Sequence, residues 1–236
     1  MPVEIMLEPL VIAIDGPAGA GKSTVALGLA RELELPYVDS GATYRAAALK
    51  VLETAIPPTS EDRIAAMLSA TVLEGMPADD TFHVLLDGKD VTGQIRSPEV
   101  TEAASMVSRI PGVRRALIAL QRNFARGRGV VMEGRDIGTI VFPGAALKVF
   151  LTASPLERAR RRMGDEKGRG VSLGEVALEI QQRDRRDSER NVSPLVPAPD
   201  ATLIDSTGLS AGEVVQRILQ RLEEMKLISG MDRRRE

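Results

Sequence analysis

The chain has 236 residues, of which 43% are hydrophobic and 27% are charged, and its formal net charge is −2. A chain of this length can bury one large core, or a core with small inserted domains, and so weak a charge argues against non-specific coating of nucleic acid or an anionic membrane. The absence of cysteine excludes disulfides and thiolate chemistry, and the single histidine, His83, argues against a His-based metal site or a histidine-centred triad.

The N-terminus shows no pattern of a targeting segment. Met1–Ile5 has no basic region, no long apolar run and no small-residue cleavage site. Apolar runs elsewhere fall far short of the roughly 18 residues that suggest a spanning helix. We therefore expect a cytoplasmic protein with no membrane partner.

The first elements follow a strand–loop–helix–strand order. Leu10–Ile14 is wholly apolar, as in a strand buried on both faces of a parallel sheet. The Gly-rich loop Asp15–Ser23 leads into a helix predicted over Thr24–Leu35, which Pro36 ends. Tyr37–Asp39 reads as a second strand. This order predicts a parallel sheet with right-handed crossovers.

Three later segments are also short and apolar, namely Val130–Glu133, Leu147–Leu151 and Thr202–Asp205. The simplest architecture is an α/β fold with a five-stranded parallel sheet flanked by helices. The last helix is expected over Ser210–Met225, with Ser210 as N-cap and Glu213 completing a capping box.

The region from about Pro57 to Ile110 breaks this alternation. Thr81–Leu86 has strand character, and Asp87-Gly88 is a strong two-residue hairpin turn leading into Lys89–Thr92. We expect a small antiparallel sheet inserted into the parallel core.

The loop after the first strand matches the phosphate-binding pattern G-x-x-x-x-G-K-[ST]. Glycines let backbone N–H groups face phosphate oxygens, and the following helix presents the positive end of its dipole. Lys22 can reach the β- and γ-phosphates of a nucleotide, and Ser23 can ligate Mg²⁺. The alternative is a Gly-rich turn whose lysine points to solvent. The predicted ATP-binding residues are Gly16, Pro17, Ala18, Gly19, Ala20, Gly21, Lys22, Ser23 and Thr24.

Polar residues follow two further strands, where the ligand crevice of an open α/β sheet lies. After the second strand, Arg45 can clamp a phosphate, Tyr44 can stack or donate, and Ser40 can hydrogen-bond. After the third, Glu133 could hold Mg²⁺ through water or orient an acceptor group. The alternatives are an ordinary helix start and a turn with an Arg135–Asp136 surface pair.

Two arginine-rich segments remain, Glu157–Arg162 and Gln181–Arg190. Positioned guanidinium groups stabilise the negative charge of phosphoryl transfer, and a basic hairpin closing over ATP would exclude water. For any single arginine a solvated helix face with ion pairs is the better interpretation. We expect a few of the set to act.

Together these residues resemble the bacterial cytidylate kinase family, from about Leu10 to Met225. The Gly-Arg-Asp-Ile-Gly-Thr run followed by Val-Phe-Pro is far more specific to that family than the phosphate-binding loop. Ser23 stands where some members have Gly, and Glu133 replaces an aspartate of some relatives. The matching segments are Ile14–Thr24, Asp39–Arg45, Gly134–Pro143, Arg183–Asp187 and Pro194–Pro197.

The resemblance implies a P-loop kinase core with a nucleoside-monophosphate-binding (NMP-binding) insertion and a short lid. The core would comprise residues 1–56, 111–153 and 191–236, the insertion 57–110 and the lid region 154–190. The implied reaction moves the γ-phosphoryl group of ATP onto CMP or dCMP, with Mg²⁺ held by Ser23 and waters. We also expect a monomer that binds no nucleic acid.

The resemblance also assigns residues. It implies that Lys22, Arg135, Arg158 and Arg162 are catalytic, with the lid arginines drawn from Arg158, Arg161 and Arg162. The implied CMP-binding residues are Ser40, Tyr44, Arg45, Ser105, Arg114, Arg135, Asp136, Arg183, Asp187 and Arg190.

Other functions stay open at the level of sequence. The nearest is a P-loop kinase for another acceptor, such as AMP, UMP or shikimate. A nucleotide switch would need a base-recognition motif and a water-positioning glutamine, a combination that is not found. The arginine clusters suggest nucleic-acid binding only weakly, because the overall balance is acidic and the aromatics number only two Tyr and four Phe.

Overall fold

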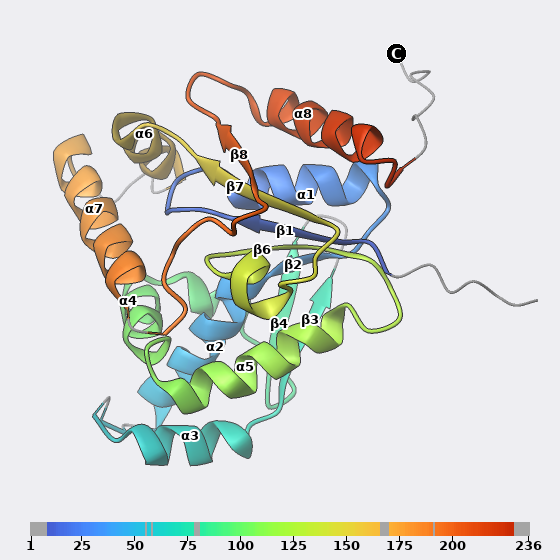
Figure 1. Ribbon diagram of the computed structural model, residues 1–236. Helices are drawn as coiled ribbons and strands as arrows, with labels where there is room; N and C mark the ends of the chain where they lie inside the picture. The colour runs from blue at the N-terminus through green and yellow to red at the C-terminus, as the bar shows by residue number, and fades with distance from the viewer. Residues whose placement is uncertain are drawn as a thin grey trace, which may run out of the picture.

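A computed structural model describes residues 9–54, 56–57, 59–77, 81–165, 170–190 and 192–228. Its central sheet has five parallel strands in the order β2-β6-β1-β7-β8 (Figure 1). All five predicted strands are confirmed, with ends that differ by at most one residue. They are β1 (Val11–Asp15), β2 (Tyr37–Asp39), β6 (Val130–Gly134), β7 (Leu147–Thr152) and β8 (Thr202–Asp205).

The register of the sheet brings polar residues to one edge. In the central strand β1, Ile12 and Ile14 are fully buried, as expected for a parallel sheet covered on both faces. Asp15 pairs with Gly134, and Asp39 pairs with Glu133. The carboxyl ends of β1, β2 and β6 therefore place three carboxylates along the same edge.

Helices cover both faces of this sheet (Figure 1). The helices α1 (Lys22–Glu32) and α8 (Ala211–Glu224) pack together on one face, and α5 (Pro111–Phe124) covers the other. The capping box predicted for the last helix is confirmed, since Ser210 Oγ accepts from the Glu213 amide and the Glu213 carboxylate accepts from the Ser210 amide.

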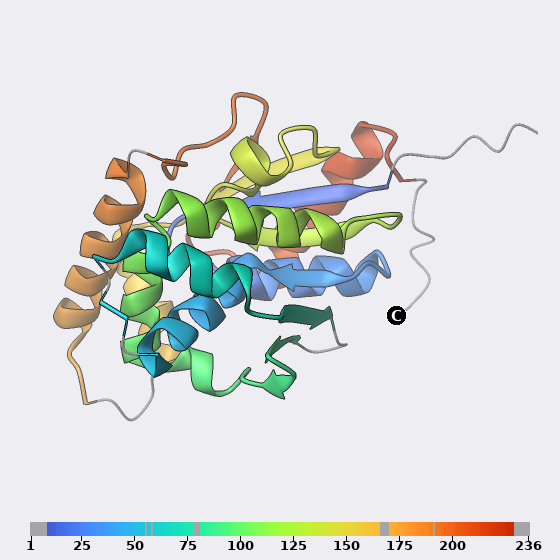
Figure 2. The ribbon, with the colours of Figure 1, turned by 90° about the horizontal axis from the view of Figure 1, so that it is seen from below.

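The hairpin predicted within residues 57–110 is also confirmed. Asp87 and Gly88 have φ values of 51° and 79°, the positive values that a two-residue type I′ turn requires. The hairpin belongs to a small antiparallel sheet with a third strand that was not predicted. Figure 2 shows this small sheet beside the β2 edge of the central sheet. Its strands are β3 (Leu73–Pro77), β4 (Phe82–Leu86) and β5 (Lys89–Asp90).

The small sheet shares its core with the large one. The ring of Phe82 meets the ring of Phe124 on α5 edge-on, with 5.5 Å between centroids, and a Cβ on Gly75 would lie 2.2 Å from Phe82. One hydrophobic cluster runs from the central sheet into this region. The boundaries of the insertion stay a prediction. The flanking helices are α2 (Ser40–Glu53), α3 (Glu61–Ser69), η1 (Gln94–Arg96) and α4 (Pro98–Val107).

Three further elements complete the described residues. A π-helical turn, η2 (Ile137–Val141), follows β6 and was not predicted. The helices α6 (Pro155–Asp165) and α7 (Leu173–Glu189) pack against each other within the predicted lid region. Part of the glycine-rich stretch Gly164–Gly170 between them lies outside the described residues. None of the described helices is long and apolar enough to cross a membrane.

Candidate active site

The Gly-rich loop lies directly on the central sheet. A Cβ on Gly16 would fall 2.0 Å from the carbonyl oxygen of Leu151 in β7, so only glycine allows this approach. Gly21 has φ 88° and turns the chain into α1. The Lys22 ammonium group folds back over the loop and donates to the carbonyl oxygen of Pro17 at 2.8 Å. The local geometry is therefore that of a phosphate cradle at a helix N-terminus.

Lys22 lies in a positively charged environment. Its side chain is buried, and burial together with Arg135 and Arg183 lowers the pKa of Lys22 to about 7, although Glu133 and Asp15 oppose the shift. An anion that binds beside such a lysine favours its protonated form. The two carboxylates near Lys22 thus only partly offset the effects of burial and of the neighbouring arginines on its pKa.

Further arginines surround this position. Burial and the nearby Arg135, Arg45 and Arg162 lower the pKa of Arg183 to about 10, with Asp187 opposing them. Arg135 donates through Nε to Asp187 at 2.9 Å. Arg45 pairs with Asp39 at 2.6 Å. These cations come from α2, from the loop after β6 and from α6 and α7. We call Lys22, Arg45, Arg135, Arg162 and Arg183 the cation cluster.

A second group of predicted residues meets around Asp136. Its carboxylate accepts from Arg114 of α5, and Arg190 Nη2 lies 3.9 Å away, too far for a hydrogen bond. The Arg114 guanidinium lies 5.4 Å from the centre of the Tyr44 ring, a cation–π distance. The structure therefore brings residues from α2, α5, the loop after β6 and the C-terminus of α7 together.

Several polar atoms in these residues are buried without a hydrogen-bond partner. They are the Tyr44 hydroxyl, Arg45 Nε, Arg114 Nε and Arg190 Nη2, and among the described residues only Gln121 and Thr139 add further atoms of this kind. Buried polar groups are nearly always satisfied in a folded protein. Because these unpaired atoms are concentrated in one predicted pocket, they indicate that a ligand supplies the missing hydrogen-bond partners.

The two predicted serines lie on elements that adjoin these residues. Ser40 is 4% exposed, and a Cβ on Gly134 would lie 2.5 Å from its hydroxyl oxygen. Ser105 is half-buried on α4, which packs against α7. Each serine therefore belongs to an element that adjoins the arginines above.

Oxygen atoms suited to Mg²⁺ lie beside the loop. Ser23 Oγ donates to Glu133 Oε1, and the Tyr37 hydroxyl donates to the same oxygen at 3.0 Å. The longer side chain of Glu133 thus reaches the serine across the sheet edge. No group of three or more acidic, His or Cys residues suited to a metal occurs among the described residues. A hydroxyl with one carboxylate fits Mg²⁺, which keeps water and substrate phosphates as its other ligands.

Asp15 is a buried carboxylate that the sequence analysis did not single out. Its two oxygens accept from the amides of Ile137 and Gly138 at 2.8 and 2.7 Å, and burial raises the pKa of Asp15 to about 6. Asp15 therefore ties the strand before the Gly-rich loop to the segment that carries Arg135 and Asp136. Its position at the carboxyl end of β1 was the one sequence feature that could have pointed to it.

The arginines of α6 bind main-chain oxygens. Arg158 donates to the carbonyls of Ala153 and Ala18, both at 3.1 Å. Arg161 donates to both oxygens of Ser206 and, at 3.3 Å, to the carbonyl of Ala20. Both side chains thus support the Gly-rich loop and its surroundings, and the expected contact of Arg158 with a transferring phosphoryl group stays a prediction.

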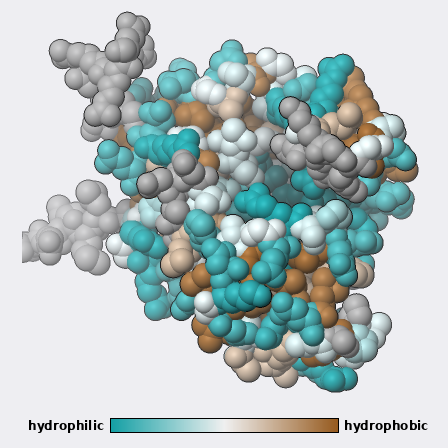
Figure 3. Space-filling model, turned by 180° about the vertical axis from the view of Figure 1, so that it is seen from behind, coloured by the Kyte–Doolittle hydropathy of each residue, from teal (hydrophilic) through white to brown (hydrophobic). Residues whose placement is uncertain are grey.

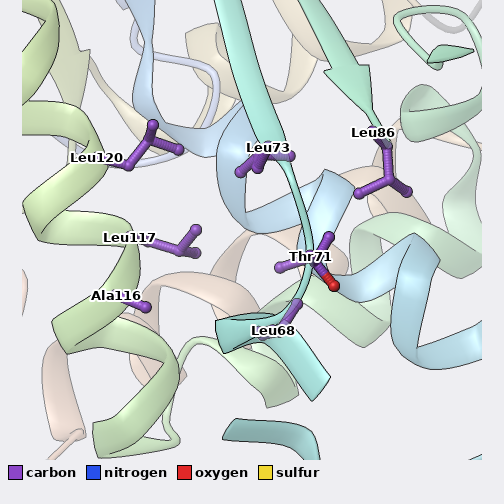
Figure 4. A pocket seen from close by; sticks show the side chains of 8 residues that line it. Leu68, Thr71, Leu73, Leu86, Ala116, Leu117 and Leu120 are labelled. Carbon is purple, nitrogen blue, oxygen red and sulfur yellow. The ribbon is translucent and has the colours of Figure 1, made fainter. Parts of the chain in front are cut away.

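Two hollows bear on where a ligand can lie. Figure 3 shows hydrophilic residues around a hollow near the middle of one face. A separate apolar cavity of about 130 Å³ lies between α2, α3, α5 and the small sheet (Figure 4). Aliphatic side chains line it and none of the cation cluster does, so it is no place for a phosphate. Its lining residues are Ala47, Leu68, Thr71, Leu73, Leu86, Ala116, Leu117 and Leu120.

Comparisons with known proteins point to one family. A sequence model described as cytidylate kinase matches residues 12–224. A cytidylate kinase from Desulforamulus reducens is 50% identical over 223 residues, which cover 94% of this chain and 100% of that protein. A bifunctional pantoate ligase/cytidylate kinase from Synechococcus sp. (strain JA-3-3Ab) is 50% identical over 225 residues, which cover 93% of this chain and only 42% of that protein.

The chain therefore spans less than half the length of this bifunctional relative. Among solved structures, an uncharacterized protein from Eubacterium ventriosum ATCC 27560 has a TM-score of 0.53 at 13% identity, covering 91% of this chain and 98% of that one. At so low an identity the likeness concerns the fold alone.

Proposed function

The chain belongs to the cytidylate kinase family, and on that premise we propose that it transfers the γ-phosphoryl group of ATP to CMP or dCMP, giving ADP and CDP or dCDP. The observation that carries the proposal is the cation cluster. Arg135 and Arg183 lie close enough to the buried Lys22 to lower its pKa, and Arg135 also lowers the pKa of Arg183, so a polyanion bound among these cations would offset their repulsion.

The donor is assigned to the Gly-rich loop. Its amides and the N-terminus of α1 cradle the phosphates of ATP, and Lys22 leaves the carbonyl of Pro17 to bind the β- and γ-phosphates. Ser23 and Glu133 would hold a Mg²⁺ ion beside these phosphates. When bound, the ion neutralises charge on the phosphates.

The acceptor is assigned to the pocket around Asp136. Arg45, Arg114 and Arg135 hold the acceptor phosphate, and the unpaired atoms of Tyr44 and Arg190 are available to hydrogen-bond the nucleoside. Ser40, Ser105, Asp136, Arg183 and Asp187 complete the pocket. On this assignment, residues 57–110 act as the NMP-binding insertion and residues 154–190 as the lid region.

The reaction requires little general-base catalysis. A phosphate monoester, with a second pKa of about 6, is largely dianionic at neutral pH and can attack directly. The arginines align it for in-line transfer and stabilise the charge that spreads over the transferred group. The absence of a histidine from this mechanism is therefore no obstacle.

The test compares CMP, dCMP, UMP and AMP side by side in a coupled ADP-release assay with Mg–ATP. We expect kcat/KM for CMP or dCMP to exceed that for AMP by about 100-fold or more, because a site with buried polar groups discriminates strongly against a base that leaves them unpaired. Lys22→Ala, with an unchanged thermal melting curve, should abolish turnover. Preference for AMP would contradict the acceptor assignment, and ADP release that no acceptor stimulates would favour a nucleotide switch.

We also propose that the protein acts in the cytoplasm as a monomer without nucleic-acid or membrane partners. The near-neutral charge and the sparse aromatics support this. Light scattering coupled to size-exclusion chromatography should give the mass of one chain, 25.4 kDa. A dimeric mass would contradict the monomer.

A further inference from the structure

The tip of the Gly-rich loop is held on three sides by α6 and α7. The amide of Ala18 donates to Asp184 Oδ1 of α7 at 3.2 Å, and its carbonyl accepts from Arg158 of α6 at 3.1 Å. Its methyl group packs in a separate hydrophobic cluster with Ala159, Val176 and Ile180 of the same two helices. Every group that Ala18 offers thus contacts this helix pair, which stands at one end of the molecule in Figure 1.

The backbone of α6 also touches the loop. A Cβ on Gly19 would lie 2.7 Å from the carbonyl oxygen of Arg158, and the φ of Gly19 is 74°. Arg158 and Asp184 join the two helices above the loop through a largely buried ion pair. The position of the loop tip therefore depends on where α6 and α7 lie.

Helix α7 carries acceptor-pocket residues next to Asp184. Arg183 precedes it, Asp187 follows one turn later and Arg190 ends the helix. Asp187 pairs with Arg135, and Asp184 is among the carboxylates that hold the pKa of Arg135 above its usual value against the effect of burial. One rigid helix thus contacts both the loop for the donor and the arginines for the acceptor.

We propose that Asp184 is a positioning residue that couples the two nucleotide pockets, so that an acceptor bound to α7 fixes the loop tip and tightens the binding of the donor nucleotide. The coupling is reciprocal by linkage, so the donor nucleotide tightens acceptor binding by the same factor. This inference rests on the proposed function, since it assumes that a nucleoside monophosphate binds at α7.

Isothermal titration calorimetry tests the coupling without turnover. Mg–ADP is titrated into the protein with and without saturating CMP, a pair that cannot react. In the wild type we expect CMP to tighten ADP binding by about fivefold or more, the lower end of common allosteric couplings. In Asp184→Asn the factor should fall to within about twofold of unity. The dissociation constant of CMP alone should change little, because Asp184 is assigned no contact with CMP and Arg135 keeps its ion pair with Asp187.

Two variants separate coupling from stability. Asp184→Asn leaves the Arg158 charge without its partner and can destabilise the fold. The double variant Arg158→Gln/Asp184→Asn removes both charges and should lose the coupling as well. Asp200→Asn is the matched control, since it breaks the ion pair to the buried Lys148 at 2.8 Å, away from the loop tip, and should keep the wild-type factor.

Each outcome bears on one statement. If the wild type binds Mg–ADP but not CMP, the proposed function fails and the inference falls with it. If CMP binds but the wild type shows no coupling, or the folded Asp184 variants keep it, only the inference is overturned. Equal loss in Asp200→Asn would also overturn it, because the effect would then come from general loosening.

Discussion

Binding of ADP to the Gly-rich loop should be accompanied by uptake of a proton by Lys22. In the free protein, burial and the neighbouring Arg135 and Arg183 lower the pKa of Lys22 to about 7. Phosphate oxygens placed beside the ammonium group favour its charged form and raise this pKa toward that of an ordinary lysine. Above pH 7 a lysine that was mostly neutral therefore becomes protonated in the complex.

The size of the uptake follows from the pKa. With a pKa near 7, about half of Lys22 is neutral at pH 7 and about 0.9 of it at pH 8. A phosphate monoester has lost its last proton at pH 8, so the ligand contributes almost nothing there. Asp15, whose pKa is about 6, is also ionised at that pH. We expect uptake of about 0.9 proton per ADP at pH 8 and about 0.5 from Lys22 at pH 7.

Calorimetry in buffers of different ionisation enthalpy measures this number. Mg–ADP is titrated at pH 8 in HEPES and in Tris, and the slope of the observed heat against the ionisation enthalpy gives the protons bound. Lys22→Arg keeps a permanent charge and should reduce the uptake to near zero. Lys50→Met is the matched control, since Lys50 lies at the surface beside Asp87. Uptake of less than about 0.2 proton in the wild type, or unchanged uptake in Lys22→Arg, would refute the reasoning.

Three further predictions concern other parts of the molecule. Arg135→Ala should lower kcat/KM for CMP about 100-fold, because the acceptor phosphate loses charged hydrogen bonds. The dissociation constant of Mg–ADP should change by less than about threefold. Equal losses for CMP and for Mg–ADP would contradict the acceptor assignment. Glu133→Gln should raise the Mg²⁺ concentration for half-maximal activity by about 10- to 100-fold, and an unchanged Mg²⁺ titration would exclude it from the metal site. Ala116→Leu should partly fill the apolar cavity and raise the free energy of unfolding in urea by about 1 kcal/mol. Ala119→Leu on the same helix does not reach the cavity and should leave this free energy unchanged. Equal gains in the two variants would point to helix propensity instead.

The strongest local patterns predicted the fold. The apolar strands, the Asp87-Gly88 turn and the capping box at Ser210 each have a sequence pattern that is complete within a few residues, and all were confirmed. The strand β3 has no such pattern, because Gly75 and Pro77 weaken it as a strand sequence. It forms because Gly75 lets the rings of Phe82 and Phe124 approach closely. That contact joins segments far apart in the chain, which sequence periodicity does not record.

The sequence predicted which residues belong to the candidate site better than it predicted the contacts between them. The family resemblance indicated Tyr44, Arg114 and Arg190, but the sequence could not show that their polar atoms are buried without partners. Asp184 lay inside the segment Gln181–Arg190, where its carboxylate looked like part of a solvated ion-pair face. Its bond to the Ala18 amide spans 166 positions in the chain, so only the fold reveals it.

The hydrogen bonds of the α6 arginines change the expectation that these side chains contact the transferred phosphoryl group. A guanidinium group that binds carbonyl oxygens has fewer donors left for a ligand, and Arg158 and Arg161 are held in this way by the loop and its surroundings. Arg183 differs, since its charge is buried among other cations and is opposed chiefly by Asp187. Burial lowers the pKa values of Lys22 and Arg183, and neighbouring cations lower them further. A phosphoryl group entering between these two side chains would relieve that repulsion. We therefore expect the charge-neutralising role to fall more on α7 than on α6, with Arg183→Ala lowering kcat for CMP more than Arg161→Ala does.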